Sequence, residues 1–461
     1  MRFSANCGLL AGIIVLAFNV HSASANTLHV GTCALKGTVY GSIQSAVDAA
    51  APGDVIAVCP GDYAEQVKIT KSLTVKGVAG GQPVRITVPA GGLVQNTTTL
   101  HSGFPTAAQV LVSPDTTADV IFKGIVVDGT GNNITTCGLQ LAGIYYRNAG
   151  GTIIGSTAQN QILPDGYQGC QSGLGIFVEN QASGTDSVNI EKNTVTNFDK
   201  NGITVELAAA AANITHNTVT GIGPTTLIAQ NGIEVSYGAT ASITANTISD
   251  LIYSPDTYGS SGIILYQLDS AEYQTPTLVQ GNTIDNAQYG VVLDAVNGTA
   301  DNLVQIHKNT ITNAQFAGVG LYSDGISDDY ISVTANKIDT TTIYDGIDAC
   351  SDNNTITGNT VSNSSAEAAI HLDALCTQPD NSPSGSGNTV SSNKILTACV
   401  GILSGPPQGA NTIGANKFTN VTNTFIYGTD SYSCGDNRAQ VRHTPKKGHS
   451  GAPAALAPLR R

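Results

Sequence analysis

The sequence predicts an all-β solenoid, because one short phrase recurs nine times between residues 187 and 421. Each copy is an apolar-alternating run, then Asn, then Thr or Lys, then a β-branched or bulky apolar residue. A unit of this length cannot bury an apolar face alone, so it must stack on its neighbours. Asn tolerates left-handed backbone at a tight bend, and stacked amides can hydrogen-bond from rung to rung. We therefore expect one column of side chains: Asn193, Asn217, Asn246, Asn282, Asn309, Asn336, Asn359, Asn393 and Asn416.

A second repeat begins each time with Gly or Ala and continues as an alternating strand, as in Gly202-Ile203-Thr204-Val205-Glu206. Because side chains alternate across a strand, the first and third residues after the small one should fill the core. The second and fourth should then face outward and stack into two solvent-facing columns about 35 Å long. These columns contain Glu179, Glu206, Glu234, Tyr266, Asp294, Tyr322, Asp348, His371 and Asp373.

The chain opens with a short amphipathic helix around residues 41–50, in which Ile43, Ala46 and Val47 recur at helical spacing and Ser42 is the expected N-cap. The motifs Pro52-Gly53-Asp54, Pro60-Gly61-x-Tyr63 and Lys71-Ser72-Leu73-Thr74-Val75-x-Gly77 follow. This order resembles the N-terminal cap of right-handed parallel β-helix proteins. They form the pectate-lyase-like superfamily, and the resemblance is to its carbohydrate-binding and sugar-hydrolase repeat branch. It implies a single-stranded right-handed parallel β-helix with an N-terminal capping helix.

Three regions are expected along the chain. Residues 1–25 read as a signal peptide, because Arg2 precedes an apolar run and Ala23-Ser24-Ala25 follows it. Residues 26–435 form the β-helix, with a Pro-, Thr- and Ser-rich loop arm at 89–119. Residues 436–461 form a basic, disordered tail. The chain is therefore expected to be secreted or periplasmic.

Eight cysteines remain after the signal peptide, an even number that favours disulfides in an exported chain. Sequential pairing is the simplest arrangement, because each bridge then closes one or two turns of the solenoid. The expected pairs are Cys33–Cys59, Cys137–Cys170, Cys350–Cys376 and Cys399–Cys434.

The charge distribution excludes some partners. Residues 26–435 carry 13 Lys and Arg against 32 Asp and Glu, a net charge of −19. No Lys or Arg lies between Lys200 and Lys308, although nine acidic residues do. Such a surface repels nucleic acid and anionic membranes. It also argues against a polyanionic sugar, unless a divalent cation bridges the two.

Two groups of outward residues could carry chemistry. Glu206 and Glu234 lie on adjacent rungs, displaced by two residues, with Glu179 beneath Glu206. Paired carboxylates can supply the acid and the base of a glycosidase, and Glu179 would raise the pKa of Glu206 by like-charge repulsion. Tyr266 and Asp294 would then position the sugar. The fallback site is Asp348, His371 and Asp373, and Tyr322 is a further expected substrate-binding residue.

No cofactor motif is found, and the signature elements of polygalacturonases, pectate lyases and pectin methylesterases are absent. Calcium stays open, because Asp324, Asp328, Asp329 and Asp352 lie in loops near the fallback site. The leading hypothesis is an exported β-helix that binds a neutral or weakly charged polysaccharide and, if it is an enzyme, hydrolyses it. The alternatives are a non-catalytic surface or matrix protein and a calcium-dependent polysaccharide lyase or epimerase. The sequence leaves the oligomeric state undetermined.

Overall fold

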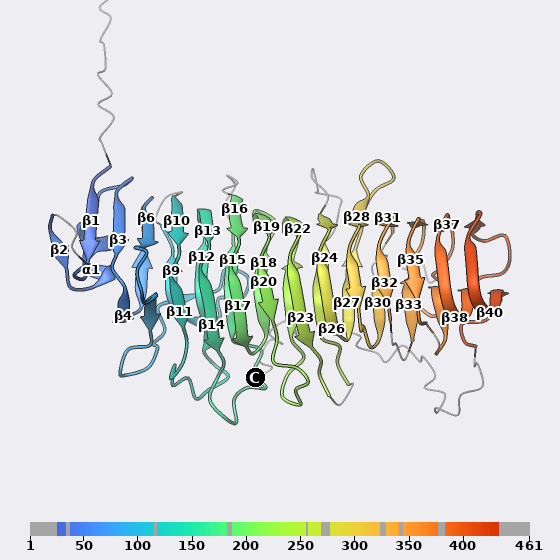
Figure 1. Ribbon diagram of the computed structural model, residues 1–461, viewed down its shortest axis with the longest axis horizontal. Helices are drawn as coiled ribbons and strands as arrows, with labels where there is room; N and C mark the ends of the chain where they lie inside the picture. The colour runs from blue at the N-terminus through green and yellow to red at the C-terminus, as the bar shows by residue number, and fades with distance from the viewer. Residues whose placement is uncertain are drawn as a thin grey trace, which may run out of the picture.

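The computed structural model describes residues 25–33, 37–114, 118–181, 187–254, 257–268, 277–322, 329–340, 344–364, 366–376 and 383–432. These residues form a parallel β-helix, an elongated stack of coils that runs from one end of Figure 1 to the other. The parallel solenoid predicted from the two repeats is confirmed, while the handedness implied by the family resemblance stays a prediction. The expected signal peptide and basic tail lie outside the described residues, apart from Ala25. No helix among the described residues is long and apolar enough to cross a membrane.

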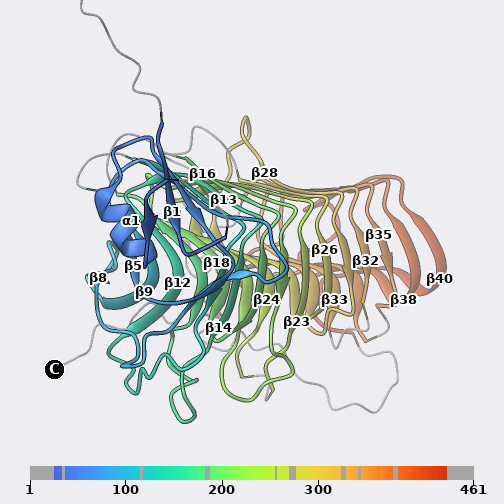
Figure 2. The ribbon, with the colours of Figure 1, turned by 60° about the vertical axis from the view of Figure 1, so that its left-hand side comes forward.

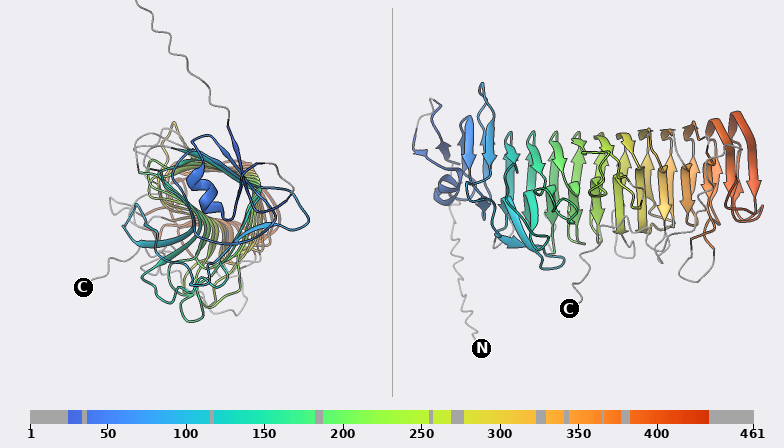
Figure 3. Two further views of the ribbon diagram at one scale, coloured as in Figure 1. Left: turned by 90° about the vertical axis from the view of Figure 1, so that its left-hand side faces the viewer. Right: turned by 90° about the horizontal axis from the view of Figure 1, so that it is seen from below.

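Each regular coil contributes one strand to each of three faces. The stacked coils are seen obliquely in Figure 2 and from below on the right of Figure 3. The first face is a separate sheet, in the order β2 (Val39–Tyr40), β1 (Thr27–Val30), β3 (Val55–Val58), β6 (Thr74–Gly77), β10 (Asp119–Lys123), β13 (Gly150–Ile154), β16 (Ser187–Glu191), β19 (Ala211–Thr215), β22 (Thr240–Thr244), β25 (Leu278–Gln280), β28 (Val304–His307), β31 (Ile331–Thr334), β34 (Thr355–Thr357), β37 (Thr389–Ser391) and β39 (Thr412–Ile413).

From β17 (Thr194–Phe198) onwards, the second face directly follows the Asn bend of each coil. Its strands are β4 (Gly61–Ala64), β7 (Val84–Thr87), β11 (Val126–Asp128), β14 (Thr157–Gln161), β17 (Thr194–Phe198), β20 (Thr218–Thr220), β23 (Thr247–Leu251), β26 (Thr283–Ala287), β29 (Thr310–Thr312), β32 (Lys337–Asp339) and β35 (Thr360–Ser362).

The third face carries the Gly-initiated repeat. Its strands are β5 (Val67–Ile69), β9 (Pro105–Val112), β12 (Gln140–Arg147), β15 (Leu174–Glu179), β18 (Asn201–Glu206), β21 (Asn231–Ser236), β24 (Ser261–Leu268), β27 (Tyr289–Val296), β30 (Ala317–Tyr322), β33 (Asp345–Cys350) and β36 (Ala368–Leu372). Two long strands, β38 (Lys394–Ser404) and β40 (Lys417–Tyr427), then run along both the second and the third face.

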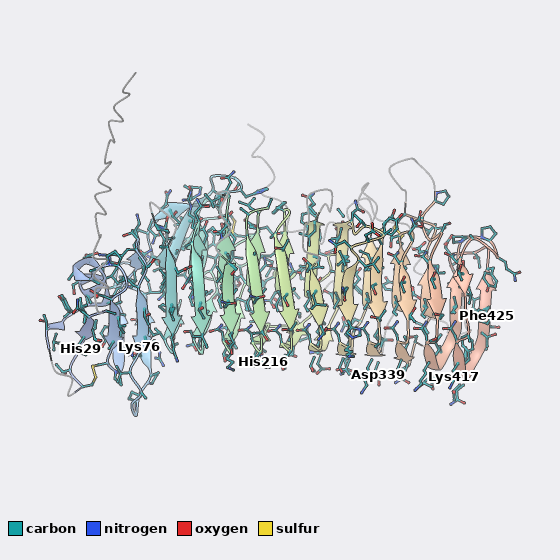
Figure 4. All side chains as sticks on the ribbon, turned by 90° about the horizontal axis from the view of Figure 1, so that it is seen from above. His29, Lys76, His216, Asp339, Lys417 and Phe425 are labelled. Atoms are coloured by element: carbon teal, nitrogen blue, oxygen red, sulfur yellow. A yellow bond between two sulfur atoms is a disulfide. The ribbon has the colours of Figure 1, made fainter. Side chains whose placement is uncertain are left out.

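The nine Asn side chains form one column, as predicted. Each Nδ2 donates to the Oδ1 of the next Asn at 3.0 Å, from Asn193 through to Asn416. The expectation that Asn itself adopts the left-handed backbone is wrong. The positive φ belongs to the residue before it, for example 54° at Lys192 and 56° at His216. In Figure 4, His216, Asp339 and Lys417 lie along one long edge of the solenoid, while Phe425 stands at its C-terminal end.

The core lies inside the coils and follows the predicted alternation. The first and third residues after each small residue, such as Ile203 and Val205, are fully buried in one continuous apolar cluster. Gly is required where it begins the repeat: a Cβ on Gly202 would lie 2.5 Å from the Val219 side chain and 2.6 Å from the Gly232 carbonyl of the next rung. Close stacking of the coils therefore selects a small residue here.

The helix α1 (Ile43–Ala49) is present where it is expected, and the Ser42 side chain accepts from the Ser45 N–H as its N-cap at 3.1 Å. The Glu65 carboxylate accepts from the Ile43 and Gln44 N–H groups at 2.7 and 2.9 Å. The end-on view of Figure 3 shows α1 across the N-terminal end of the coil. That it protects an open sheet edge stays a prediction.

Three of the predicted disulfides are confirmed: Cys33–Cys59, Cys137–Cys170 and Cys350–Cys376. Cys399 is also disulfide-bonded, while Cys434, its expected partner, lies outside the described residues.

The loop arm expected at 89–119 is only partly a loop. Residues 105–112 form β9, which pairs in parallel with β5 and β12, because Ala108, Val110 and Val112 supply the apolar alternation of a rung. The segment before β9, with the short strand β8 (Thr97–Thr98), folds back antiparallel to it and crosses the outer surface of the third face. This crossing segment builds one wall of the candidate site.

Candidate functional site

A pocket lies on the outer surface of the third face, where residues 99–102 of the arm cross β15, β18 and β21. It holds about 530 Å³ of space, part of it open to solvent, and His101, Lys200, Glu206, Glu234 and Tyr237 line it. The sequence predicted Glu206 and Glu234 in a shared site, and the pocket brings both together. Its arm wall could not be predicted from the repeat, because the arm is an insertion between rungs.

Glu179 lies directly beneath Glu206 in the strand register, as predicted. It is fully buried, and its carboxylate accepts from the backbone N–H groups of Leu100 and His101 at 2.9 and 3.1 Å and from the Tyr145 hydroxyl. Glu179 therefore ties the arm to the solenoid directly beside Glu206.

Glu206 is the carboxyl group best placed to hold a proton. Burial is the largest cause that raises its pKa well above the usual range, and a hydrogen bond and the negative charge from Glu179 add to it. Glu234 contributes a smaller like-charge effect. The predicted influence of Glu179 is thus present, but the effect of burial exceeds it, even though the Glu206 side chain is only partly covered.

Glu234 sits one rung further along, opposite Thr204, so it is displaced by two residues from Glu206 as expected. It is 1% exposed and accepts from Asn201 Nδ2 at 2.8 Å and from the Ser236 hydroxyl at 3.1 Å. Burial raises the pKa of Glu234, whereas the Lys200 charge and these donors oppose that rise. Its surroundings therefore favour the charged form more than those of Glu206 do.

Lys200 is a residue of the candidate site that the sequence did not predict. It lines the pocket, and its charge interacts with Glu234. Its ammonium donates to the Ala229 carbonyl at 3.0 Å, and the residue is only 5% exposed. Its position in the sequence, directly before the strand that carries Glu206, could have identified it as a residue of the site. The expectation of a groove without cations is wrong.

Burial lowers the pKa of Lys200 to about 8, although the Glu234 charge opposes this. Because the folded pKa lies below the unfolded value of 10.5, the unfolded chain binds more protons between these limits, so stability should rise with pH there. We expect the free energy of unfolding to increase by about 2 kcal/mol from pH ~8 to ~10. Denaturant unfolding of the wild type and of Lys200→Met should show this rise only in the wild type. An equal rise in both would contradict the assignment.

The mouth of the pocket has an aromatic edge. The His101 and Tyr237 rings stack with centroids 4.0 Å apart, and the Tyr266 ring meets Tyr237 edge-on at 5.6 Å. Flat rings beside carboxylates offer apolar faces to the C–H surface of a sugar. His101 comes from the arm and Tyr237 from the solenoid, so the sequence could not predict that the two rings meet.

The expectation of an open acidic stripe along the third face is wrong. Tyr266 and Asp294 are 5% and 3% exposed and do not line the pocket. Tyr266 instead packs in a small apolar cluster with Ile264 and Tyr289. Alternation predicted correctly that these residues leave the core, but both are nonetheless buried, and neighbouring aromatic rings cover Tyr266. A sugar-positioning role for Tyr266 and Asp294 is therefore not supported.

The fallback residues form a second, separate cluster. Asp348 and His371 pair in the strand register as predicted, and Tyr322 donates to Asp348 at 2.8 Å. His371 is fully buried, and Asp373 is 5% exposed, so the expected solvent-facing arrangement is wrong here too. The sequence missed Asp345, whose Oδ2 lies 3.2 Å from His371 Nδ1.

Burial and negative neighbours dominate this cluster. Burial and the charges of Asp373 and Asp345 raise the pKa of Asp348 well above its usual range. Burial raises the pKa of Asp373 to about 6. The surrounding carboxylates raise the pKa of His371 well above its usual range, although burial opposes them. The cluster therefore crowds several carboxyl groups around one imidazole, and this crowding disfavours the charged forms of Asp348 and Asp373.

The calcium hypothesis is not tested for every residue. Asp324 and Asp328 lie outside the described residues. Asp329 and Asp352 use carboxylate oxygens to accept backbone N–H groups, from Asp352 at 3.1 Å and from Ser386 at 2.7 Å. These contacts hold loops together.

A family model described as "Periplasmic copper-binding protein (NosD)" matches residues 224–374 and 269–443, which together span slightly less than half of the chain. That match falls short of establishing membership. No curated protein sequence matches this chain.

Several solved structures share the general architecture at low identity. The A-module of mannuronan C-5 epimerase AlgE4 from Azotobacter vinelandii is 14% identical, with a TM-score of 0.48, over 85% of this chain and 95% of its own. The Dettilon tailspike protein is 16% identical, with a TM-score of 0.47, over 82% of this chain and 64% of its own. The catalytic domain of a GH87 α-1,3-glucanase is 10% identical, with a TM-score of 0.43, over 87% of this chain and 67% of its own. These likenesses are too distant to carry an argument about activity.

Proposed function

We propose that this chain is an exported β-helix protein that binds a polysaccharide and hydrolyses its glycosidic bonds in the pocket beneath the arm. The observation that carries the proposal is the difference between the two carboxyl groups of that pocket. Glu206 is held towards the protonated form beside Glu179, whereas Glu234 lies beside the Lys200 cation and several neutral donors. Neighbouring acids whose environments push their pKa values apart are typical of an acid and base pair.

The proposed reaction uses both groups in one displacement. Glu206 gives its proton to the glycosidic oxygen as the bond from that oxygen to the anomeric carbon breaks. Glu234 takes a proton from a water molecule, whose oxygen forms the new bond to the anomeric carbon. His101 and Tyr237 would hold the face of the sugar. Lys200 would keep Glu234 charged until it accepts the proton.

A neutral or weakly charged glycan remains the proposed substrate. Within the pocket, Glu234 offsets the positive charge of Lys200, and Glu206 and Glu179 add two further carboxyl groups. The site therefore has no excess of cations to attract an anionic sugar. The three disulfides support the proposed export, because such bonds persist in oxidising compartments.

Lys200 also favours a second candidate, a lyase or epimerase acting on uronates. Such enzymes need a base near the sugar C5 proton and a group that neutralises the substrate carboxylate. The low pKa of Lys200 would suit the base, although the pocket offers no second cation among its lining residues.

The test is to incubate the full-length secreted protein with soluble neutral glucans, mannans and galactans and with polyuronates. New reducing ends from a neutral glycan, without ultraviolet absorbance of an unsaturated uronate, would support hydrolysis. Unsaturated products or epimerised uronates would replace it with the second candidate. Binding without any change in the glycans would overturn catalysis and leave the non-catalytic protein.

A further inference from the structure

His371 lies outside the proposed active site and has an unusual pair of environments for its two ring nitrogens. Its Nδ1 is 3.2 Å from Asp345 Oδ2. Its Nε2 is buried, lacks a hydrogen-bond partner, and points towards Asp430, whose Oδ1 is 4.0 Å away. A buried polar atom without a partner is costly, so the cluster is built for a ligand at this nitrogen.

The Asp345 contact determines which nitrogen is free to bind. Asp345 accepts from the Ala368 N–H at 2.9 Å through one oxygen and faces His371 Nδ1 with the other. A metal ion at Nε2 would replace the ring proton on that nitrogen, while Nδ1 would keep the proton that faces Asp345. Metal-binding histidines commonly donate their other ring N–H to a carboxylate in this manner.

Two further carboxylates lie close to the His371 ring. One ring nitrogen and one oxygen each from Asp373 and Asp430 lie within 4.8 Å of one another, and the contact with Asp430 is made at Nε2. Two ligand atoms about 2.1 Å from a shared ion stand ~3 to ~4.2 Å apart, depending on the angle between them. The 4.0 Å between Nε2 and Asp430 Oδ1 falls in this range. Asp430 is 21% exposed at its side chain, which gives an ion a way in.

The local charge also calls for a cation. Among the described residues, His371 is the only basic side chain in ion-pair contact with Asp345, Asp348 or Asp430. The sequence contains no Lys or Arg between residues 337 and 394. Buried charges are normally paired or bound to metal. We propose that His371 Nε2, Asp373 and Asp430 bind one divalent first-row metal ion, Zn²⁺ or Mn²⁺, with Asp345 positioning the imidazole.

The donor set decides the class of ion. An imidazole suits first-row transition ions, whereas Ca²⁺ and Mg²⁺ prefer oxygen ligands alone. Soft ions such as Cu⁺ prefer thiolate or thioether ligands. The cysteines of the described residues are all disulfide-bonded, and the single methionine of the sequence is Met1. One nitrogen and two carboxylates therefore fit a divalent first-row ion such as Zn²⁺ or Mn²⁺ better than Ca²⁺, Mg²⁺ or Cu⁺.

Equilibrium dialysis of the tag-free, chelator-treated full-length protein against Zn²⁺, Mn²⁺ and Ca²⁺ tests the site. We expect one Zn²⁺ or Mn²⁺ per chain. Asp430→Asn should lower its affinity about 10–100-fold or more, and His371→Gln should do the same. Asp430→Asn keeps an oxygen for the Ala374 N–H, so its fold should survive. The matched control is Asp339→Asn, which changes an exposed acid on β32 and should bind like the wild type.

The visible absorption of bound Co²⁺ tests the role of Asp345, which would affect the metal ion only through His371. Asp345→Asn should shift the visible absorption bands of bound Co²⁺ and weaken binding about 10–100-fold while one ion per chain is still taken up. The proposal is overturned by a wild type that takes up neither Zn²⁺ nor Mn²⁺, or that prefers Ca²⁺. It is equally overturned if Asp430→Asn and His371→Gln bind like the Asp339→Asn control. None of these outcomes depends on hydrolysis in the pocket.

Discussion

Glu206→Gln is expected to lower glycan hydrolysis by about 10²–10⁴-fold, the usual contribution of a positioned general acid. Glutamine keeps the size of the side chain but has no proton to give to the leaving oxygen. Glu234→Gln should cause a loss of the same order, because it removes the group that activates water. The measurement is the initial rate of reducing-end release from whichever glycan the wild type cleaves, with folding of each variant checked by its unfolding transition.

Glu191→Gln is the matched control for this experiment. Glu191 lies on the first face, at the end of β16, and forms an ion pair with Lys192 away from the pocket. Its activity should equal that of the wild type. Rates within a few-fold of the wild type in both Glu206→Gln and Glu234→Gln would remove the acid and base assignment, even if the protein proves to be a hydrolase.

The rate should also depend on pH in a particular way. Activity needs Glu206 protonated and Glu234 charged, so it should fall at high pH as Glu206 ionises and at low pH as Glu234 is protonated. Since burial and Glu179 raise the pKa of Glu206 well above its usual range, the upper limit belongs to Glu206. The two carboxyl groups interact, so the limits describe the pair rather than either residue alone.

The sequence predicted the solenoid and its register well, because both follow from spacing. Stacked coils force residues at equal places in the repeat into columns, so Glu179 beneath Glu206 and Asp348 beside His371 could be read from alignment of the repeats alone. The stacking of the Asn amides likewise follows from a single buried bend in every coil.

Burial on the outer surface could not be predicted in the same way. It depends on the paths of loops and of the arm, which do not repeat, so the repeat pattern left Glu179 and His371 facing solvent although both are fully buried. The predicted in-and-out alternation of side chains also fails at the residue directly before the small residue of each repeat. Asn201 precedes Gly202, yet its side chain reaches Glu234 on the outer surface. Asp345, at the same place before Gly346, was missed for this reason.

Asn282→Ala is expected to destabilise the folded chain by about 3 kcal/mol, because each buried polar group left without a partner costs roughly 1–3 kcal/mol. Asn282 Oδ1 accepts from the backbone N–H of Asn246 at 2.9 Å and from its Nδ2 at 3.0 Å. Asn282 Nδ2 donates to the Ile243 carbonyl at 2.9 Å and to Asn309 at 3.0 Å. The side chain is 1% exposed, so water cannot replace these contacts. Denaturant unfolding under non-reducing conditions, which keep the disulfides intact, measures the loss.

Two other Asn positions separate the effect of the buried column from that of any Asn. Asn213→Ala removes an exposed contact, Asn213 Nδ2 to Asn189 Oδ1 at 2.9 Å, and should change stability by less than about 0.5 kcal/mol. Asn416 ends the column and bonds one neighbour, Asn393, rather than two, so Asn416→Ala should fall between Asn213→Ala and Asn282→Ala. Equal losses at all three positions would mean that the column contributes no more than ordinary surface amides. A graded loss would show that its strength comes from burial between two neighbouring coils.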